Sequence, residues 1–342
     1  MNTSNETLSK NQITIALDAM GGDHGTLENV KGAIEAVEKN ADLNIALVGN
    51  SDELSKELKK YSKSNHIKQI QIIPSKGFIK ESESPILALK KNPEASIAIA
   101  TMLVKSQKAD ALVSMGSTGA SMATASHILG LVDGFERPAL GGPILGIAPQ
   151  TMFIDLGANV DCRPAQLFTF GIIGNAFAQH FWKIKTPRIG LLSVGTESSK
   201  GNRQVKETAT LFKNSKLNFI GNIEPTDLPK NIAEVVICDG FVGNILMKLV
   251  ESLGHSIPSH LEPLLKSKLP DDDIIEIQNK IYSLNTPAET FGGGPLFGVK
   301  GLSIVGHGRA HSSAISRAII TAKMLVKEKF ITNLNITLQE IN

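Results

Sequence analysis

The segment ITIALDAMGGDHGTLENVKGAIEAVEKNADLNIALV, residues 13–48, holds the pattern that decides the fold. A short apolar run, ITIAL, is followed by an amphipathic segment from about 26 to 39 and then by a second apolar run, LNIALV. Short apolar runs are typical of buried strands, and the segment between them has helical spacing. A helix near 51–61 and the run IQII continue this alternation, which predicts a parallel sheet covered by helices.

The rest of the chain repeats the alternation and departs from it once. Apolar residues from 245 to 269 recur at helical spacing, and a second helical stretch follows PDDD, which predicts a protruding helical hairpin over 245–285. Pro258 and Pro263 are expected to kink or interrupt its first arm. We predict a three-layer, doubly wound, mostly parallel α/β fold that forms a single compound domain over 1–342. Five further strands are expected at 111–114, 152–154, 188–194, 235–238 and 302–305.

Composition limits the classes of protein to which the chain can belong. Its 342 residues are 42% hydrophobic and 20% charged, which is ordinary for a globular protein. The net charge of +2 gives no overall field for nucleic acid. Cys162 and Cys238 form no Cys-x-x-Cys pair, and the polar N-terminus MNTSNETLSKNQ resembles no signal peptide. We therefore expect a soluble cytoplasmic protein that binds no nucleic acid.

Six small, polar or glycine-rich segments follow the expected strands. In parallel sheets the loops beyond the carboxyl ends of the strands form the ligand site, so these loops are expected to meet at one rim. Glycine, asparagine and aspartate can also simply turn the chain from strand to helix. The segments are DAMGGDHG (18–25), SMGSTGA (114–120), DLGANVDC (155–162), GTESSKGN (195–202), DGFVGN (239–244) and GHGRAHS (306–312).

The chemistry of these loops favours an anion. Exposed backbone N–H groups at helix starts attract a phosphate or an oxyanion, yet neither the G-x-G-x-x-G spacing nor a Walker A loop is present. Lys200 is either an anion ligand or a solvated lysine, and Asn244 is either an oxyanion donor or an N-cap. His307 is either a phosphate donor or a structural loop residue. His307 and His311 lack the glutamate of H-E-x-x-H, and only His311 is expected on the helix, so no metal site is predicted.

Acidic residues and cysteines of the loops receive structural interpretations. Asp18, Asp23, Asp155 and Asp239 each follow a strand, where we expect them to brace the loops through backbone hydrogen bonds rather than to face an anion. No G-x-S-x-G elbow is present, and neither thiol has the setting of a catalytic nucleophile.

Taken together, the motifs resemble one known family. DAMGGD, SMGSTGA, DLGAN, the Glu197, Lys200 and Gly201 set, DGFVGN and FGGGPLFGVKG (291–301) occur in the order of the bacterial phosphate acyltransferases. The stretch KESESPILALKKNPEASIAIA (80–100) and NFIGNIE (218–224) also match, and the likeness runs from about 13 to 329. Ser117, Pro225 and Arg309 depart from the usual pattern of the family.

The resemblance implies transfer of a long-chain acyl group from acyl carrier protein to inorganic phosphate, which gives an acyl phosphate for a membrane glycerol-phosphate acyltransferase of phospholipid synthesis. It implies a fold similar to phosphotransacetylases and isocitrate dehydrogenases, a homodimer, peripheral membrane contact and no cofactor. By motif, Lys200 and Asn244 are the expected catalytic residues. The expected phosphate- or substrate-binding residues are Gly22, Asp23, His24, Thr118, Gly119, Asn159, Glu197, Asp239 and His307.

Three rival functions remain at this point. The first is a phosphotransacylase that uses acyl-coenzyme A as donor, and the second is a decarboxylating dehydrogenase on a related fold. The third is a module that binds acyl carrier protein or phosphate without catalysis. For the helical hairpin the resemblance implies dimerisation, with the tip near 261–269 on lipid, whereas an ordinary packed helix pair is the alternative.

Overall fold

The computed structural model describes residues 12–80, 82–285 and 292–341. The N-terminal segment 1–11 and the motif positions Glu81 and Phe291 lie outside the described residues. Contacts divide the chain into two compact units, one made of 1–129 and 301–327 and the other of 130–300 and 328–342. We call them unit 1 and unit 2. The chain passes from one unit to the other three times. The single compound domain expected over 1–342 stays a prediction.

Unit 1 contains the segment that opens the sequence, and its strands form a parallel array in the order β3-β2-β1-β4-β11. All residues of β4 and β11 are buried, so both faces of the array are covered by helices. The strands are β1 (Ile13–Asp18), β2 (Leu43–Gly49), β3 (Ile70–Pro74), β4 (Ala111–Ser114) and β11 (Leu302–Val305).

The helices of unit 1 connect these strands in the predicted alternation. Helix α1 packs on α11, and α4 packs on α5. The helices are α1 (Gly25–Glu38), α2 (Ser51–Lys59), α3 (Pro85–Lys91), α4 (Ser96–Lys105), α5 (Thr118–Thr124) and α11 (Ser312–Lys327), with short turns η1 (Ile67–Gln69) and η2 (Ala125–Leu129). The β1–α1–β2–α2–β3 alternation expected from residues 13–73 is therefore confirmed.

Unit 2 holds a mixed array in the order β10-β5-β6-β9-β7-β8, in which β5 runs antiparallel to both of its neighbours and the last four strands are parallel. The sequence predicted β6, β7 and β9 but not β5, β8 or β10. The strands are β5 (Ala139–Gly142), β6 (Met152–Ile154), β7 (Ile189–Leu192), β8 (Phe219–Ile223), β9 (Val235–Ile237) and β10 (Gly294–Phe297).

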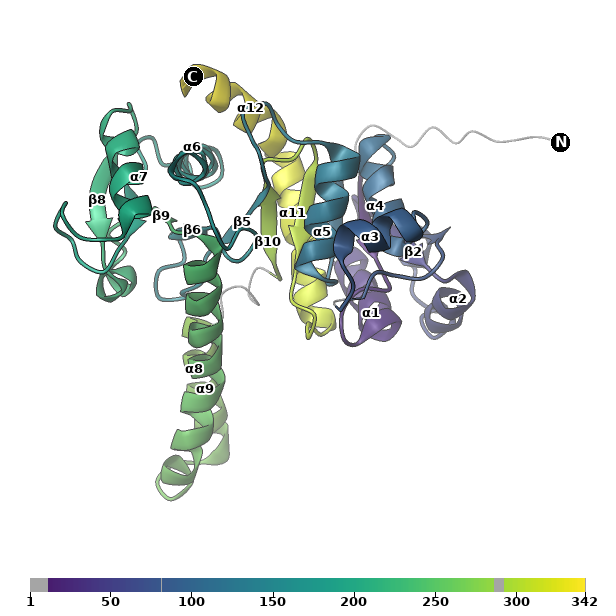
Figure 1. Ribbon diagram of the computed structural model, residues 1–342. Coiled ribbons are helices and arrows are strands. Elements are labelled where there is room, and N and C mark those ends of the chain that lie inside the picture. Colours follow the sequence, from purple (N-terminus) through teal and green to yellow (C-terminus); the bar gives the residue numbers. More distant parts are fainter. Residues whose placement is uncertain (1–11, 81, 286–291, 342) are drawn as a thin grey trace. The chain divides into compact units, whose positions relative to one another are not determined.

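The helices of unit 2 cover this array and extend from it. Helix α6 packs between α7 and α12, whereas α8 and α9 pack on each other and project as a stalk (Figure 1). The helices are α6 (Pro164–His180), α7 (Arg203–Lys213), η3 (Pro225–Lys230), α8 (Gly240–Lys266), α9 (Asp271–Asn285) and α12 (Phe330–Ile341). The mostly parallel, doubly wound fold class is thereby confirmed, and the expected hairpin is present.

Helix α8 differs from its prediction in one respect. It continues from Gly240 to Lys266 through Pro258 and Pro263, so the expected interruption is wrong. A proline removes one backbone donor, and the many remaining bonds of a 27-residue helix carry it past two such losses. The exposed apolar residues of α8 follow four-residue steps and form a stripe along the stalk: Phe241, Ile245, Leu249, Leu253 and Ile257.

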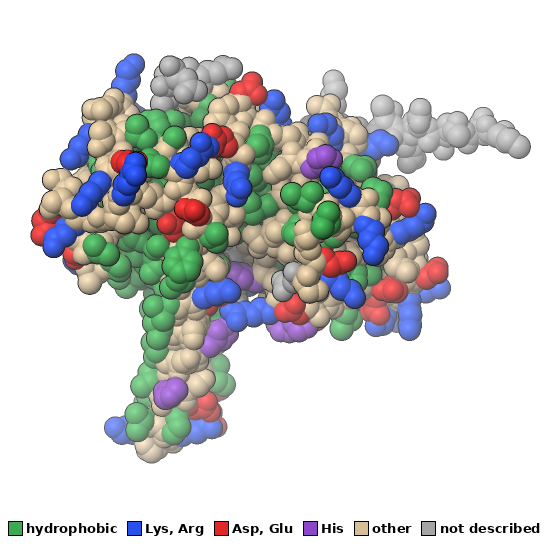
Figure 2. Space-filling view, in the orientation of Figure 1, with side chains coloured by type: hydrophobic (Ala, Val, Ile, Leu, Met, Phe, Trp, Pro, Cys, Tyr) green, Lys and Arg blue, Asp and Glu red, His purple; other side chains and the backbone are tan. Residues whose placement is uncertain are grey.

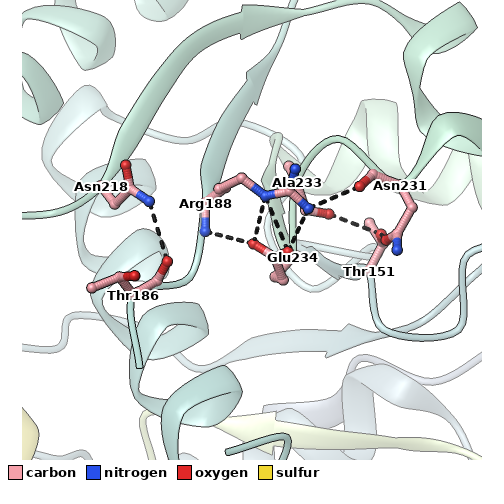
Figure 3. Close-up of polar contacts among 7 residues, drawn as sticks. All are labelled: Thr151, Thr186, Arg188, Asn218, Asn231, Ala233 and Glu234. Atoms are coloured by element: carbon pink, nitrogen blue, oxygen red, sulfur yellow. Dashed lines mark hydrogen bonds and ion pairs between the residues drawn. The ribbon is translucent and has the colours of Figure 1, made fainter. Parts of the chain in front are cut away.

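The amino ends of three parallel strands in unit 2 are tied together by polar contacts (Figure 3). The Arg188 guanidinium, just before β7, donates to both oxygens of Glu234, just before β9, at 2.6–3.1 Å. Thr151, just before β6, donates to the Ala233 carbonyl at 2.8 Å. These contacts fix the edge of the sheet opposite to the loops that follow the strands.

Candidate functional site

Each unit gathers three of the six predicted loops. In unit 1 the loops 18–25, 114–120 and 306–312 follow β1, β4 and β11, which are neighbours in the sheet. In unit 2 the segments 155–162, 195–202 and 239–244 follow β6, β7 and β9, also neighbours, but 240–244 form the start of α8 instead of a loop. Since carboxyl ends of neighbouring parallel strands share an edge, each unit presents one three-loop cluster.

Close glycine contacts hold the loops of unit 1 together. Gly22 has φ +88°, and a Cβ there would lie 3.1 Å from the Gly308 carbonyl oxygen. Asp23 donates its backbone N–H to that same oxygen at 2.7 Å. A Cβ at Gly21 would lie 2.8 Å from the Gly116 nitrogen. The DAMGGD motif thus needs its glycines because its backbone touches both neighbouring loops.

A buried carboxylate connects two loops of this cluster through hydrogen bonds. Asp18 is only 2% exposed and accepts a hydrogen bond from the Ser114 hydroxyl at 2.8 Å. The same hydroxyl accepts the Gly116 N–H at 3.0 Å. Burial raises the pKa of Asp18, while its hydrogen bonds act in the opposite direction. Asp18 therefore braces the loops, as the sequence indicated.

Two histidines meet at the edge of the unit 1 cluster. The rings of His24 and His311 are stacked with centroids 4.4 Å apart, and His311 Nδ1 lies 3.7 Å from a Glu28 oxygen. Helix α11 begins at Ser312, so His311 precedes the helix and its predicted helical position is wrong. Half-buried Thr118 and Gly119 begin α5, and half-buried His307 lies in the loop after β11.

In unit 2 another buried carboxylate organises the DLGAN loop. Asp155 is fully buried and accepts five hydrogen bonds, from the N–H groups of Leu140, Gly157, Ala158 and Asn159 and from the Asn159 amide. Burial raises the pKa of this carboxyl, and the donors oppose that rise. Asn159 is buried as well, and its amide also donates to the Pro138 carbonyl at 2.8 Å.

The first turn of α8 rests directly on this loop. Asp239 caps the helix by accepting the Val242 N–H at 2.8 Å. Asn244 lies inside the helix, so its N-cap interpretation is wrong. Gly157, with φ +128°, would place a Cβ 3.3 Å from the Asn244 Cβ. The Gly243 backbone lies even closer to the DLGAN loop, because a Cβ at Gly243 would lie 1.9 Å from the Asp155 carbonyl oxygen.

The third loop of unit 2 carries Lys200. A Cβ at Gly195 would lie 2.7 Å from Lys200 Cγ and 2.9 Å from a Glu197 carboxylate oxygen, so both side chains lie against the Gly195 backbone. The Glu197 carbonyl accepts the Lys200 N–H at 2.9 Å and the Asn222 amide at 3.1 Å. Strands β7 and β9 pair directly, so the Lys200 loop and the start of α8 that carries Asn244 follow neighbouring strands.

The two thiols of unit 2 are buried and contact backbone carbonyls of the DLGAN loop. Cys162 donates to the Asn159 carbonyl at 3.3 Å and Cys238 to the Asp155 carbonyl at 3.6 Å. Burial and the Asp155 charge raise the pKa of Cys162 to about 12, and the same causes raise the pKa of Cys238 well above its usual value.

Both thiols are therefore expected to resist alkylation in the folded protein, because the thiolate is the reactive form. Treatment with iodoacetamide at mildly alkaline pH, followed by mass spectrometry, should show no label on the native protein and two labels in strong denaturant. Rapid labelling of the native protein would contradict this environment.

Sequence reasoning missed the close-contact roles of Gly157, Gly195 and Gly243. Each lies within one of the six predicted segments, but the neighbour that a Cβ would contact comes from a distant part of the chain or from a side chain whose position depends on folding. Among the residues that the structure describes, no three His, Cys, Asp or Glu side chains gather as a metal site.

Comparison with known proteins identifies the family. The family described as fatty acid synthesis protein matches residues 13–333. A phosphate acyltransferase of Dictyoglomus turgidum is 40% identical over 319 residues, which are 92% of this chain and 94% of the relative. A phosphate acyltransferase of Clostridium acetobutylicum is 37% identical over 335 residues, which are 96% of this chain and 99% of the relative. The chain belongs to the phosphate acyltransferase family. The resemblance is confirmed, and with it the prediction of an acyltransferase.

Solved structures support the fold. A phosphotransacetylase of Streptococcus pyogenes superposes with a TM-score of 0.61 at 18% identity, and covers 93% of this chain and 95% of its own. The EutD phosphotransacetylase of Staphylococcus aureus gives 0.60 at 16% identity, with coverage of 92% and 94%. At this identity the likeness concerns the fold, which agrees with the phosphotransacetylase-like prediction.

Proposed function

We propose that this member of the phosphate acyltransferase family transfers a long-chain fatty acyl group from acyl carrier protein to inorganic phosphate. The product would be an acyl phosphate, the donor for a membrane glycerol-phosphate acyltransferase. The observation that carries the proposal is that Lys200 lies in the loop after β7 and Asn244 lies in the first turns of α8 after β9, and these two strands are paired.

The reaction requires no nucleophile from the protein. A phosphate oxygen attacks the thioester carbonyl, the C–S bond breaks, and the thiolate leaves and takes up a proton. In this proposal Lys200 holds the phosphate as a point charge. The Asn244 amide donates to the oxyanion of the tetrahedral intermediate, and such a fixed donor is worth about 3 kcal/mol.

The other predicted residues receive supporting roles in the proposal. In unit 1 the Gly22, Asp23, His24, Thr118, Gly119 and His307 positions would contact substrate. Glu197 would hold the Lys200 loop and Asp239 the start of α8 that carries Asn244, consistent with their backbone and capping contacts. Asn159, buried beneath the Asp155 turn, would act by positioning that loop.

The decisive experiment incubates palmitoyl-carrier protein with the enzyme, with and without inorganic phosphate. A mixed anhydride that is labile to acid and hydroxylamine should form only when phosphate is present. Palmitoyl-coenzyme A as the better donor would favour the phosphotransacylase alternative, and reduction of a nicotinamide cofactor would favour the dehydrogenase. Carrier binding without cleavage would leave only a binding module.

The stalk of α8 and α9 is proposed to form the homodimer contact and to touch the membrane with its tip. None of the described helices is both long and apolar enough to cross a bilayer. The tip nevertheless exposes Leu264, whose exposed fraction is 63%. Burial of such side chains in a lipid surface would give reversible peripheral association.

Flotation with vesicles tests the tip. Leu264→Glu combined with Leu265→Glu should reduce the fraction of protein that floats with phosphatidylglycerol vesicles, because charge opposes insertion. Ile86→Glu combined with Leu87→Glu makes the same change at two exposed positions of unit 1 and should not reduce it. Equal flotation of the tip variant and the wild type would refute tip binding.

A further inference from the structure

Positive charge is concentrated in one part of unit 2. Residues 181–220 hold eight basic and two acidic side chains, a net charge of +6, whereas the rest of the chain carries −4. A nearly neutral protein thus has one strongly basic segment, and such local fields steer the encounter with acidic partners. The basic residues are Lys183, Lys185, Arg188, Lys200, Arg203, Lys206, Lys213 and Lys216.

Several of these cations already have carboxylate partners. Lys183 pairs with Glu328 at 2.6 Å, and Arg188 pairs with Glu234 (Figure 3). Arg203 pairs with Glu207 on its own helix at 2.6 Å. These three cations are already paired with carboxylates of the same chain, so they are expected to contribute less to the binding of a partner protein.

Three lysines on and after α7 remain available. Lys206, Lys213 and Lys216 are exposed, and within the described part of the chain no carboxylate forms an ion pair with them. We call these three the α7 patch. Lys206 and Lys213 are seven residues apart and therefore share one helix face, while Thr208 and Phe212 are buried on the opposite side.

The surface around the α7 patch is rich in basic side chains. Leu211 is 38% exposed on the same helix, but on a different side from Lys206 and Lys213. Lysine and arginine side chains gather over this end of unit 2 in the space-filling view (Figure 2). Surface charges of this kind select an oppositely charged partner.

The α7 patch is close to the Lys200 loop along the chain. Asn202 caps α7 by accepting the Val205 N–H at 2.9 Å, so the helix begins three residues after Lys200. A partner that lies along α7 would therefore present a tethered group directly to that loop.

The position of the patch within unit 2 favours a protein over a lipid surface. Helix α7 lies beside α6 and β8, at the end of the unit away from the tip of the α8–α9 stalk (Figure 1). A membrane that meets the exposed leucines of the tip would be far from α7. The α7 patch is therefore left free for a partner from solution.

We propose that the α7 patch is the docking surface for the acidic carrier protein that delivers the acyl thioester. This inference rests on the proposed function, which makes that carrier the donor, and adds the place where it binds. Lys206, Lys213 and Lys216 attract its acidic face, and the bound carrier directs its thioester toward Lys200.

The test reverses charge on the patch and compares donors. Lys206→Glu combined with Lys213→Glu should raise the KM for palmitoyl-carrier protein and its dissociation constant, measured by fluorescence anisotropy, about tenfold. The kcat should stay near the wild-type value, as should turnover of a neutral acyl-N-acetylcysteamine thioester. The matched control, Lys56→Glu combined with Lys59→Glu, changes two exposed lysines of α2 by the same charge and should alter neither constant.

Each outcome bears on the docking surface separately from the reaction. An unchanged KM and an unchanged dissociation constant in the patch variant would overturn the proposal. The proposal would also be overturned if the patch variant bound the carrier normally but no longer floated with phosphatidylglycerol vesicles, because the patch would then bind lipid. If the wild type binds the carrier but makes no acyl phosphate, the proposed function fails. Loss of that binding in the patch variant would still support docking at α7. Absence of carrier binding by the wild type would overturn docking.

Discussion

Lys200→Ala is expected to lower phosphate-dependent cleavage of palmitoyl-carrier protein by at least about a hundredfold, because the phosphate would lose its fixed positive partner. The folded protein should be unaffected, since the Lys200 side chain is exposed and contacts Gly195 on the loop surface. The measurement is the rate of acyl phosphate formation, with the unfolding midpoint measured in parallel.

Two further variants sharpen this experiment. Lys200→Arg keeps the charge but replaces the compact ammonium with a larger, planar guanidinium, so it should retain only part of the wild-type rate of acyl phosphate formation. Lys59→Ala, an exposed lysine of α2, should leave the rate unchanged. Near-normal turnover by Lys200→Ala would remove Lys200 from the mechanism, whatever the other variants do.

Gly243→Ala is expected to have the largest effect on the fold of unit 2. The added Cβ would lie 1.9 Å from the Asp155 carbonyl oxygen, and backbone cannot rotate away as a side chain can. The first turn of α8 would have to move off the DLGAN loop and take Asn244 with it. We expect a loss of about 3 kcal/mol in the free energy of unfolding, together with loss of most acyl phosphate formation.

The control for this substitution is Gly142→Ala in β5. There the nearest atom to an added Cβ would be 3.8 Å away, which is an ordinary contact. Denaturant unfolding should separate the two variants, with Gly142→Ala close to the wild type. If Gly243→Ala were equally stable and active, the tight contact between α8 and the Asp155 turn would not be a feature of the protein in solution.

The sequence predicted the parallel strands well because each is a short, continuous apolar run with a polar loop after it. Residues 111–114, 152–154 and 302–305 form strands with the predicted bounds. Strands β5 and β10 escaped prediction because ALGG and GPLF contain glycine or proline, and they pair antiparallel instead of repeating the βα pattern. Edge strand β8 lies within the motif NFIGNIE (218–224), which the apolar pattern does not mark as a strand.

For the candidate site, sequence motifs located the loops but not the contacts within them. The bracing role of Asp155 was expected, yet its five donors come from a strand and a turn that only folding brings together. Asn244 looked like a helix start because DGFVGN ends there. The capping residue is Asp239, five positions earlier, since its carboxylate can accept the Val242 N–H.

The interleaving of the two units has a consequence for biosynthesis. Strand β11 and helix α11 belong to unit 1 but are encoded after nearly all of unit 2. Until residues 302–327 leave the ribosome, the nascent first unit has a bare β4 edge and an uncovered α1 face. Such an edge invites pairing with other chains. Chaperone protection of the growing polypeptide is therefore expected to matter most before its last 40 or so residues emerge.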